Sequence, residues 1–584
     1  MADGGLTTSM GLDFVRLALD KRIEETTAEL IQLKRSRNSF LAVTRVSPEI
    51  LGYIFRLSIT PGAAEGHFAG LQEDSYNFLL VCQHWSEVAR RTPELWGFWG
   101  NSLEIWKRQH PRSGTTPLDL VLDVEESRAG SVARVGGRNR YSDEAERQAG
   151  LFDGTLQDAL RDHTARGAIR KVHIRSDDIQ LSTTILSTLT PEDEVARDSN
   201  IESIALDGVI IYLPTFRSRP PLRHAPTNGV DASNFFSRHR FPKLQNLSLS
   251  GRVKISPWAW RCLTSNATAL TDLSLSLNQP FSDLKTSQIL LLLASNPNIR
   301  SLKLVLEASV DDGIGPKLPV PLRHLEDLYL KGQPHRVFST LRRVRLPERV
   351  DRTRMEFFSH TTQEAREAIV PHIWDYLRRD RRFEGRLGVC VWVSRNTILL
   401  HVGVFSVEDH VLGRVLKLGP PYATFSMTHQ HAPPEERDRL CIYTLAHLPQ
   451  ESIVYLETNL SAAATKEVVV GMPNLEVLSL IKPTVSNGFL LPNPDGPNPH
   501  AKLLPSLRRL YLQDANAPSS DWGPLVRYVT HQTSGGLSIS LDLHGTKDIE
   551  ICPRLVEKIE GLVEQFGREP GPSMKQLLRI PNKM

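Results

Sequence analysis

The chain has 584 residues, of which 40% are hydrophobic and 23% are charged, and its formal net charge is +4. This length exceeds what a single hydrophobic core serves, so it predicts a globular protein with two or more domains or a continuous repeat array. The small net charge argues against nucleic acid as a partner, and no window is long and apolar enough to predict a membrane span.

Residues 12–40 contain no proline or glycine and predict a helix. Large apolar residues recur along it at a heptad-like spacing, at Leu12, Leu19, Ile23, Leu30 and Leu33. Polar residues interrupt this seam, so it is short for a coiled coil. We assign residues 1–42 to a helical lead-in and favour a helix that packs on the next segment over one that dimerises.

The stretch from Val46 to Trp99 predicts three short helices. Ser47-Pro48-Glu49 combines a hydroxyl cap, a proline in the first turn and a carboxylate near the positive end of the helix dipole, and Thr92-Pro93-Glu94 repeats this arrangement. Two apolar stripes lie between these starts: Ile50, Leu51, Ile54 and Phe55, then Phe78, Val81, Cys82, Trp85 and Ala89. A unit of about fifty residues has little interior. Either the rest of the chain covers the surplus apolar surface, or a second protein docks on it.

This stretch resembles an F-box. The matching residues are Glu49, Ile50, Leu51, Ile54, Phe55, Val81, Cys82, Trp85, Pro93, Leu95 and Trp96. Two features depart from the usual pattern: Val46-Ser47 replaces Leu-Pro, and the spacer from Ser58 to Asp74 is longer than in a compact F-box. The charged helix that precedes the box and the C-terminal sequence PSLRRLYLQD are similar to those of F-box proteins abundant in mushroom-forming fungi.

The resemblance implies a helical domain at residues 43–110 that binds a Skp-type adaptor and, through it, a cullin. It implies adaptor contacts at Pro48, Ile50, Leu51, Ile54, Phe55, Val81, Cys82, Trp85, Leu95 and Trp96.

A repeat dominates the rest of the chain. The segment Leu118–Asp123 alternates apolar and polar residues and predicts a strand, whereas residues 125–150 lack periodicity and predict a mobile insertion. The pattern L-x-x-L-x-L then recurs, and its eight copies begin at Ile169, Ile201, Leu244, Leu270, Ile299, Leu325, Leu475 and Leu507. Such copies predict short strands with return helices or loops.

We therefore expect an α/β fold in which residues 111–566 form an irregular leucine-rich-repeat solenoid with a curved, mainly parallel sheet. A helix at Pro553–Phe566 would cap its end, and residues 567–584 would form a tail. The interval 331–474 breaks the pattern. It predicts a helix at Thr362–Arg379 and adjacent strands at Leu387–Val393 and Thr397–Val404. Drifted repeats are favoured there over a separate inserted domain.

No catalytic signature stands out in the sequence. It contains no GxGxxG, GxxxxGK[ST], HExxH or GxSxG pattern, so we predict a non-catalytic protein without a cofactor or metal. Five widely spaced cysteines without a CxxC pair predict a reducing compartment, cytoplasmic or nuclear or both. The arginine-dense segment 342–354 predicts either a contact for an acidic partner or a solvated charged surface.

Three functions remain open from the sequence. The first is the substrate-recognition subunit of a Skp-cullin-F-box type ubiquitin ligase, which binds the adaptor through the F-box and an unknown substrate protein through the repeats. The alternative is a leucine-rich-repeat scaffold whose F-box remnant is purely structural. The third is an enzyme housed between Leu330 and Leu475, which no motif supports.

Overall fold

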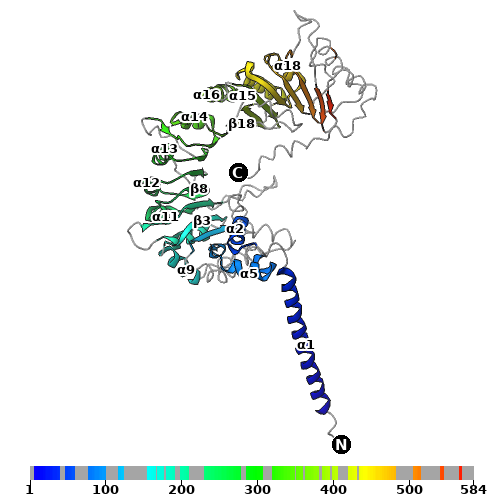
Figure 1. Ribbon diagram of the computed structural model, residues 1–584. Coiled ribbons are helices and arrows are strands. Elements are labelled where there is room, and N and C mark those ends of the chain that lie inside the picture. The colour runs from blue at the N-terminus through cyan, green and yellow to red at the C-terminus, as the bar shows by residue number, and fades with distance from the viewer. Residues whose placement is uncertain are drawn as a thin grey trace, which may run out of the picture. The chain divides into compact units, whose positions relative to one another are not determined.

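The computed structural model divides the chain into two compact units, Met1–Leu206 and Asp207–Met584. Figure 1 labels helices and strands along the chain. The structure describes residues 6–39, 46–59, 77–99, 116–123, 154–165, 167–176, 179–190, 197–208, 229–277, 285–306, 318–348, 350–359, 362–379, 385–394, 397–404, 419–429, 433–481, 504–513, 530, 540–544 and 565–567. The insertion predicted at 125–150 lies outside these ranges, and so does the predicted tail apart from residue 567.

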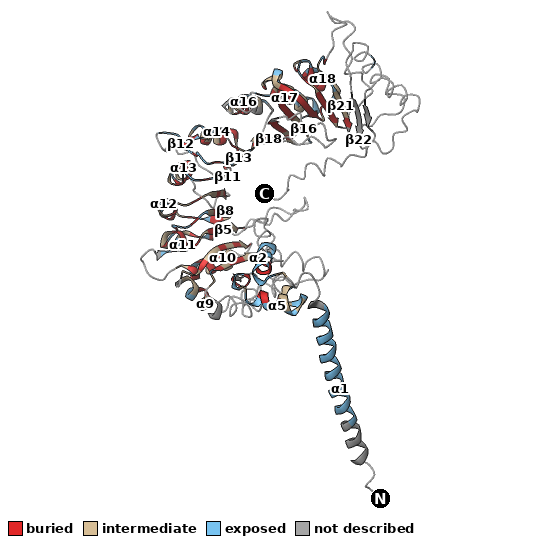
Figure 2. Ribbon diagram, in the orientation of Figure 1, coloured by how far each residue is buried: buried red, intermediate tan, exposed pale blue. Residues whose placement is uncertain are grey.

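The first unit begins with helices. They are α1 (Leu6–Ser39), α2 (Pro48–Ile59), a helical segment at 77–81, α5 (Gln83–Arg90) and the 3-10 helix η2 (Pro93–Leu95). Every side chain described in α1 is exposed, as the pale blue helix of Figure 2 shows. The prediction that this helix packs on the next segment is therefore wrong for its described side chains.

The rest of the first unit consists of strands that alternate with helices, and its first three strands pair in parallel. Its elements are β1 (Phe98–Trp99), β2 (Leu118–Asp123), α9 (Gly154–Ala165), β3 (Ile169–Ser176), α10 (Ile179–Leu189) and β4 (Arg197–Asp198). Strand β2 has the predicted bounds and pairs in parallel with both β1 and β3. Strand β5 (Ser203–Gly208) spans the division between the units.

The first long strands of the second unit are parallel, and the leucines of neighbouring repeat strands are aligned. They are β8 (Asn246–Gly251), β10 (Asp272–Leu277), β11 (Ser301–Val305), β13 (Asp327–Gly332) and β15 (Arg352–Ser359), paired in that order. The second leucines of the copies align across the strands, as in the pair Leu273 and Leu302. The apolar positions of all eight predicted copies are buried, so the repeat prediction is confirmed.

Return segments in this part are short helices and two-residue strands. They are β6 (Val230–Asp231), α11 (Ser233–Arg238), β7 (His239–Arg240), β9 (Val253–Lys254), α12 (Pro257–Asn266), α13 (Thr286–Ser295), β12 (Val320–Pro321), α14 (Pro334–Arg342) and β14 (Val344–Arg345). In α13, Leu290 and Leu293 are buried, whereas Leu291 is 50% exposed because it lies on the opposite side of the helix.

The interval 331–474 continues the sheet, but three of its strands lie side by side in the reverse of their sequence order. Strands β16 (Leu387–Val393) and β17 (Thr397–Val404) are antiparallel neighbours, as predicted. Strand β18 (Gly419–His429) lies between β17 and β15, and β16 pairs with β19 (Ile453–Thr458). The order in space is therefore β15, β18, β17, β16, β19, and only β17 runs against the others. The predicted helix at 362–379 is two helices, α15 (Thr362–Ala368) and α16 (Val370–Arg379).

Parallel strands complete the second unit. Its remaining elements are α17 (Pro434–Ala446), η5 (Gln450–Ser452), α18 (Ala462–Val470), β20 (Val477–Ile481), β21 (Arg509–Gln513), β22 (Ser540–His544) and β23 (Gln565–Gly567). The predicted capping helix lies mostly outside the described residues, and its last two residues belong to β23. The fold class is α/β, with N-terminal helices and a mainly parallel sheet alternating with helices, as in an irregular leucine-rich-repeat solenoid.

Candidate protein-interaction surfaces

The N-terminal helices have a small core of their own. Its buried members are Leu51, Phe55, Val88, Ala89, Leu95 and Trp96, and Phe78 and Trp85 pack against it. The ring of Phe55 lies 4.2 Å from that of Phe78 and 5.1 Å from that of Trp85. The indole Nε1 of Trp96 donates a 2.8 Å hydrogen bond to the carbonyl of Ala89, so this buried polar atom is satisfied.

Helix starts in this cluster agree only partly with the sequence. The N–H of Ile50 approaches the Ser47 hydroxyl at 3.4 Å, as expected of a cap, and hydrogen bonds from its own backbone and from Ser47 lower the pKa of Glu49. At the second start the Thr92 hydroxyl instead donates to the carbonyl of Val88, and only one 3-10 turn follows. The predicted helix from Phe78 to Ala89 is interrupted at Cys82, whose sulfur accepts the N–H of Trp85 at 3.5 Å.

An apolar stripe lies on the outer face of α2. Its members are Ile50, Tyr53, Ile54 and Leu57, at positions i, i+3, i+4 and i+7, and each is about half exposed. We call these four residues the outer face of α2. Leu80 and Val81, just before α5, are exposed as well. Residues on the other side of α2, Leu51 and Phe55, form the core, so the helix is apolar on two faces.

The ten predicted adaptor contacts therefore divide into three groups. Pro48, Ile50, Ile54 and Val81 are exposed. Cys82 and Trp85 are partly buried. Leu51, Phe55, Leu95 and Trp96 are buried within the helical cluster and support the exposed residues from beneath. Sequence reasoning missed Tyr53 and Leu57, although their helical spacing with Ile50 and Ile54 was a readable signal.

A second candidate surface lies on the partly exposed face of strands β11, β13 and β15. We call it the Tyr329 patch, and its members are Lys303, Tyr329, Lys331, Arg354, Glu356 and Phe358. The register aligns Lys303 with Tyr329 and Tyr329 with Arg354. The Nζ of Lys303 and the Cζ of Arg354 each lie 5.5 Å from the centre of the Tyr329 ring, within cation–π range.

Two of the three cations in the Tyr329 patch have a carboxylate partner within the patch. Glu356 lies 2.6 Å from Arg354 and 3.6 Å from Lys331, so one carboxylate serves two cations. Within the part of the chain that the structure describes, Lys303 has no carboxylate at ion-pair distance. Partial burial, with the nearby charge of Arg354, lowers the pKa of Lys303.

The same row of the sheet becomes buried beyond β15. It runs from Thr424 through His401 and Cys390 to Glu457, which are cross-strand neighbours. His401 Nδ1 lies 2.8 Å from the Thr424 hydroxyl. Glu457 accepts hydrogen bonds from the Tyr455 hydroxyl at 2.7 Å and from the Trp392 indole at 3.2 Å. Burial raises the pKa of Glu457 despite these bonds.

A cysteine, a histidine and a glutamate in one row prompt comparison with a catalytic triad. His401 Nε2 has no hydrogen-bond partner among the described residues, so it makes no hydrogen bond to the Cys390 sulfur. Burial raises the pKa of Cys390 and lowers that of His401 to about 4, so the thiol is kept protonated and the imidazole is a weak base. A nucleophile and base need a hydrogen bond between them. The row lacks this geometry.

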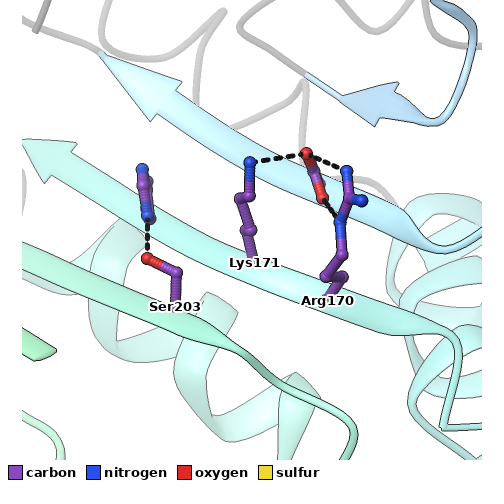
Figure 3. Close-up of polar contacts among 5 residues, drawn as sticks. Arg170, Lys171 and Ser203 are labelled. Carbon is purple, nitrogen blue, oxygen red and sulfur yellow. Dashed lines mark hydrogen bonds and ion pairs between the residues drawn. The ribbon is translucent and has the colours of Figure 1, made fainter. Parts of the chain in front are cut away.

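A polar cluster joins β2, β3 and β5 in the first unit (Figure 3). The carboxylate of Asp119 accepts two hydrogen bonds from Arg170, at 2.9 and 2.8 Å, and lies 3.3 Å from Lys171. His173 Nε2 lies 2.8 Å from the Ser203 hydroxyl. Hydrogen bonding to Asp119 raises the pKa of Arg170, whereas burial and the charge of Lys171 lower that of His173 to about 4. The bidentate pair fixes the register of two neighbouring strands.

No family model matches the chain, and no curated protein matches it in sequence. The described residues contain no group of three or more His, Cys, Asp and Glu side chains that could hold a metal ion. Throughout those residues, every helix is too short or too polar to cross a membrane.

Proposed function

We propose that this protein is the substrate-recognition subunit of a Skp-cullin-F-box type ubiquitin ligase. The observation that carries the proposal is the outer face of α2, which remains half exposed although the helix already has a core beneath it. Contiguous exposed apolar residues commonly mark interaction sites. The F-box-like spacing of the surrounding residues names a Skp-type adaptor as the protein that covers them.

In this proposal the chain performs no bond chemistry. The adaptor and cullin are held by the N-terminal helices, and the repeat sheet holds a substrate protein. The contribution is proximity, because tethering raises the effective concentration of substrate lysines at the ligase.

The rival function is a repeat scaffold with a structural F-box remnant. One observation favours it: Leu51, Phe55, Leu95 and Trp96 satisfy the sequence pattern by packing on one another. A helical cluster that is merely structural has the same core, so only the exposed residues discriminate between the two functions.

The test compares substitutions of two exposed aliphatic residues, each on the outer face of a helix. Ile54→Glu changes the outer face of α2, and the matched control Leu291→Glu changes an equally exposed position on α13. Binding of the full chain to a purified Skp-type adaptor is measured by calorimetry, and folding by thermal unfolding. Burying an isoleucine contributes about 1.5–3 kcal/mol, so Ile54→Glu should weaken adaptor binding at least about tenfold while Leu291→Glu leaves it unchanged.

Both variants should unfold at the wild-type temperature, because exposed substitutions change stability by about 0.5 kcal/mol or less. Absence of adaptor binding by the wild type rejects the receptor function and leaves the scaffold. If the wild type binds the adaptor and Ile54→Glu binds it equally well, the adaptor contacts a surface other than the outer face of α2.

A further inference from the structure

The Tyr329 patch has more positive charge than its own carboxylates balance. The patch has three cations, Lys303, Lys331 and Arg354, and one carboxylate, Glu356, while Asp207 outside the patch also acts on Lys303 through its charge. Glu356 lies against the last two of these. Lys303 is half buried and, among the described residues, is left without an ion pair. A partly buried cation of this kind gains when an external anion replaces the water it has lost.

The patch combines this charge with a flat aromatic surface. The Tyr329 ring lies between Lys303 and Arg354, and Lys331 Nζ lies 5.0 Å from the centre of the Phe358 ring. Aromatic and arginine side chains are the types that most often dominate binding energy at protein interfaces. The rings can hold the apolar part of a ligand while the two cations beside Tyr329 hold an anionic group.

Short hydroxyl side chains lie on the strands beside the patch. The same face of β8 and β10 carries short polar side chains, Ser248, Ser250, Ser274 and Ser276, all partly exposed. Their hydroxyls can donate to or accept from a peptide backbone.

Nucleic acid fits this surface poorly. Carboxylates are interspersed with the cations: Glu356 lies within the patch, and Asp327 lies 3.8 Å from Arg352 beside it. A continuous phosphate backbone would meet these negative charges, whereas a peptide with separated carboxylates can align with the cations alone.

We propose that the Tyr329 patch binds an acidic segment of a partner protein, with carboxylates of that segment pairing with Lys303 and Arg354 on the two sides of the Tyr329 ring. The identification of this partner as the substrate rests on the proposed ligase function. Binding of the acidic segment itself does not, because it needs no adaptor.

The experiment selects binders to the full chain from a displayed library of random 12-residue peptides. Selected peptides should be enriched in Asp and Glu relative to the library, and a synthetic selected peptide should lose affinity when its Asp and Glu are changed to Asn and Gln. Lys303→Met should bind that peptide about tenfold more weakly, the usual scale of one charge-assisted contact. The matched control Lys254→Met removes an exposed lysine of β9 and should bind normally.

Lys303→Gln serves as a second variant and must reproduce the loss, with thermal unfolding measured for each variant. A library that yields no binder, or binders without acidic enrichment, overturns the inference. So does equal affinity of Lys303→Met and wild type for the selected peptide, or equally tight binding of single-stranded RNA. A phosphoserine in place of the key Glu separates the two anions: tighter binding by the phosphopeptide than by the Glu peptide would overturn the assignment to carboxylate.

Failure of this inference and failure of the proposed function have different signatures. Adaptor binding is tested through Ile54 and peptide binding through Lys303, and each is measured with purified components. A chain that binds acidic peptides but no adaptor retains the inference and loses the ligase function.

Discussion

One partly buried and one buried histidine show how single residues link this fold to pH. His173 in the first unit and His401 in the second each lie 2.8 Å from a hydroxyl, of Ser203 and Thr424 respectively. Burial, reinforced by the nearby cations Lys171 and Arg354, lowers the pKa of each ring to about 4. Both imidazoles are therefore neutral in the folded protein at neutral pH.

These pKa values predict loss of stability in mild acid. The unfolded chain binds protons at each ring below about pH 6.5, whereas the folded chain binds them only near pH 4, so the stabilisation is complete above about 6.5 and falls as pH drops. Each ring should cost about 2 kcal/mol of unfolding free energy between pH 7 and pH 5.

Urea unfolding of wild type, His173→Gln and His401→Gln at both pH values measures the effect. Each variant keeps a polar partner for the hydroxyl but cannot titrate, so its stability should fall less with pH. Glu457, whose raised pKa acts with the opposite sign and favours the folded state below that pKa, is common to all three proteins. Equal pH dependence in all three would show that these rings do not titrate on unfolding.

Which residues face inward was predictable along the repeat strands but not on α2. In L-x-x-L-x-L the strand period of two assigns the leucines to the core, and Leu247 and Leu249 are indeed buried. On α2, apolar residues are adjacent, as at Ile54 and Phe55, so the spacing is compatible with either face being buried. The core partners that decide it, Val88 and Trp96, come from elements about forty residues later, and the pattern does not reveal that packing.

Glycine controls how closely neighbouring elements approach at the end of β8. Gly251 has a φ of 72°, a left-handed conformation that other residues rarely adopt. A Cβ at this position would lie 2.0 Å from the carbonyl oxygen of Gly208. That same oxygen accepts a 3.0 Å hydrogen bond from the N–H of Arg252.

Gly251→Ala should therefore destabilise the second unit. The backbone conformation costs about 1–3 kcal/mol for a residue with a Cβ, and the clash with Gly208 adds to it. Gly385→Ala is the matched control, because a Cβ there meets no atom within 4 Å. Chemical denaturation should show a lower midpoint for the first variant and a midpoint near the wild type for the second. Equal midpoints would mean that the backbone at Gly251 rearranges without cost.

Two strands without leucine, β15 and β18, are not predicted by the repeat pattern. The sequence at the start of β15 predicts only an arginine-dense segment, although Thr353, Met355 and Phe357 alternate and are buried. Strand β18 begins with Gly419-Pro420-Pro421, which usually signals a loop. Its neighbours in the sheet, β15 and β17, supply the pairing that overrides this local preference.

At the scale of the whole molecule, α1 contributes none of its described side chains to a hydrophobic core. Its described side chains are exposed, including Leu19, Ile23 and Leu30 of the heptad-like seam. Deleting residues 1–39 should therefore leave the unfolding free energy of the remaining chain within about 0.5 kcal/mol of the full chain. A marked loss of stability would show that α1 packs on the chain. Light scattering on both proteins would show whether the deletion changes the mass in solution.

The spatial strand order β15, β18, β17, β16, β19 differs from the order of synthesis, so one edge of β15 is unpaired while the chain is being made. When the ribosome has finished β15 at Ser359, the partner that lies beside it, β18, starts only at Gly419. Translation at about 5–20 residues per second keeps that edge unpaired for several seconds. A bare strand edge recruits other chains. The nascent polypeptide is thus most prone to aggregate in this window, and a stalled or truncated product ending between residues 360 and 418 would remain in it permanently.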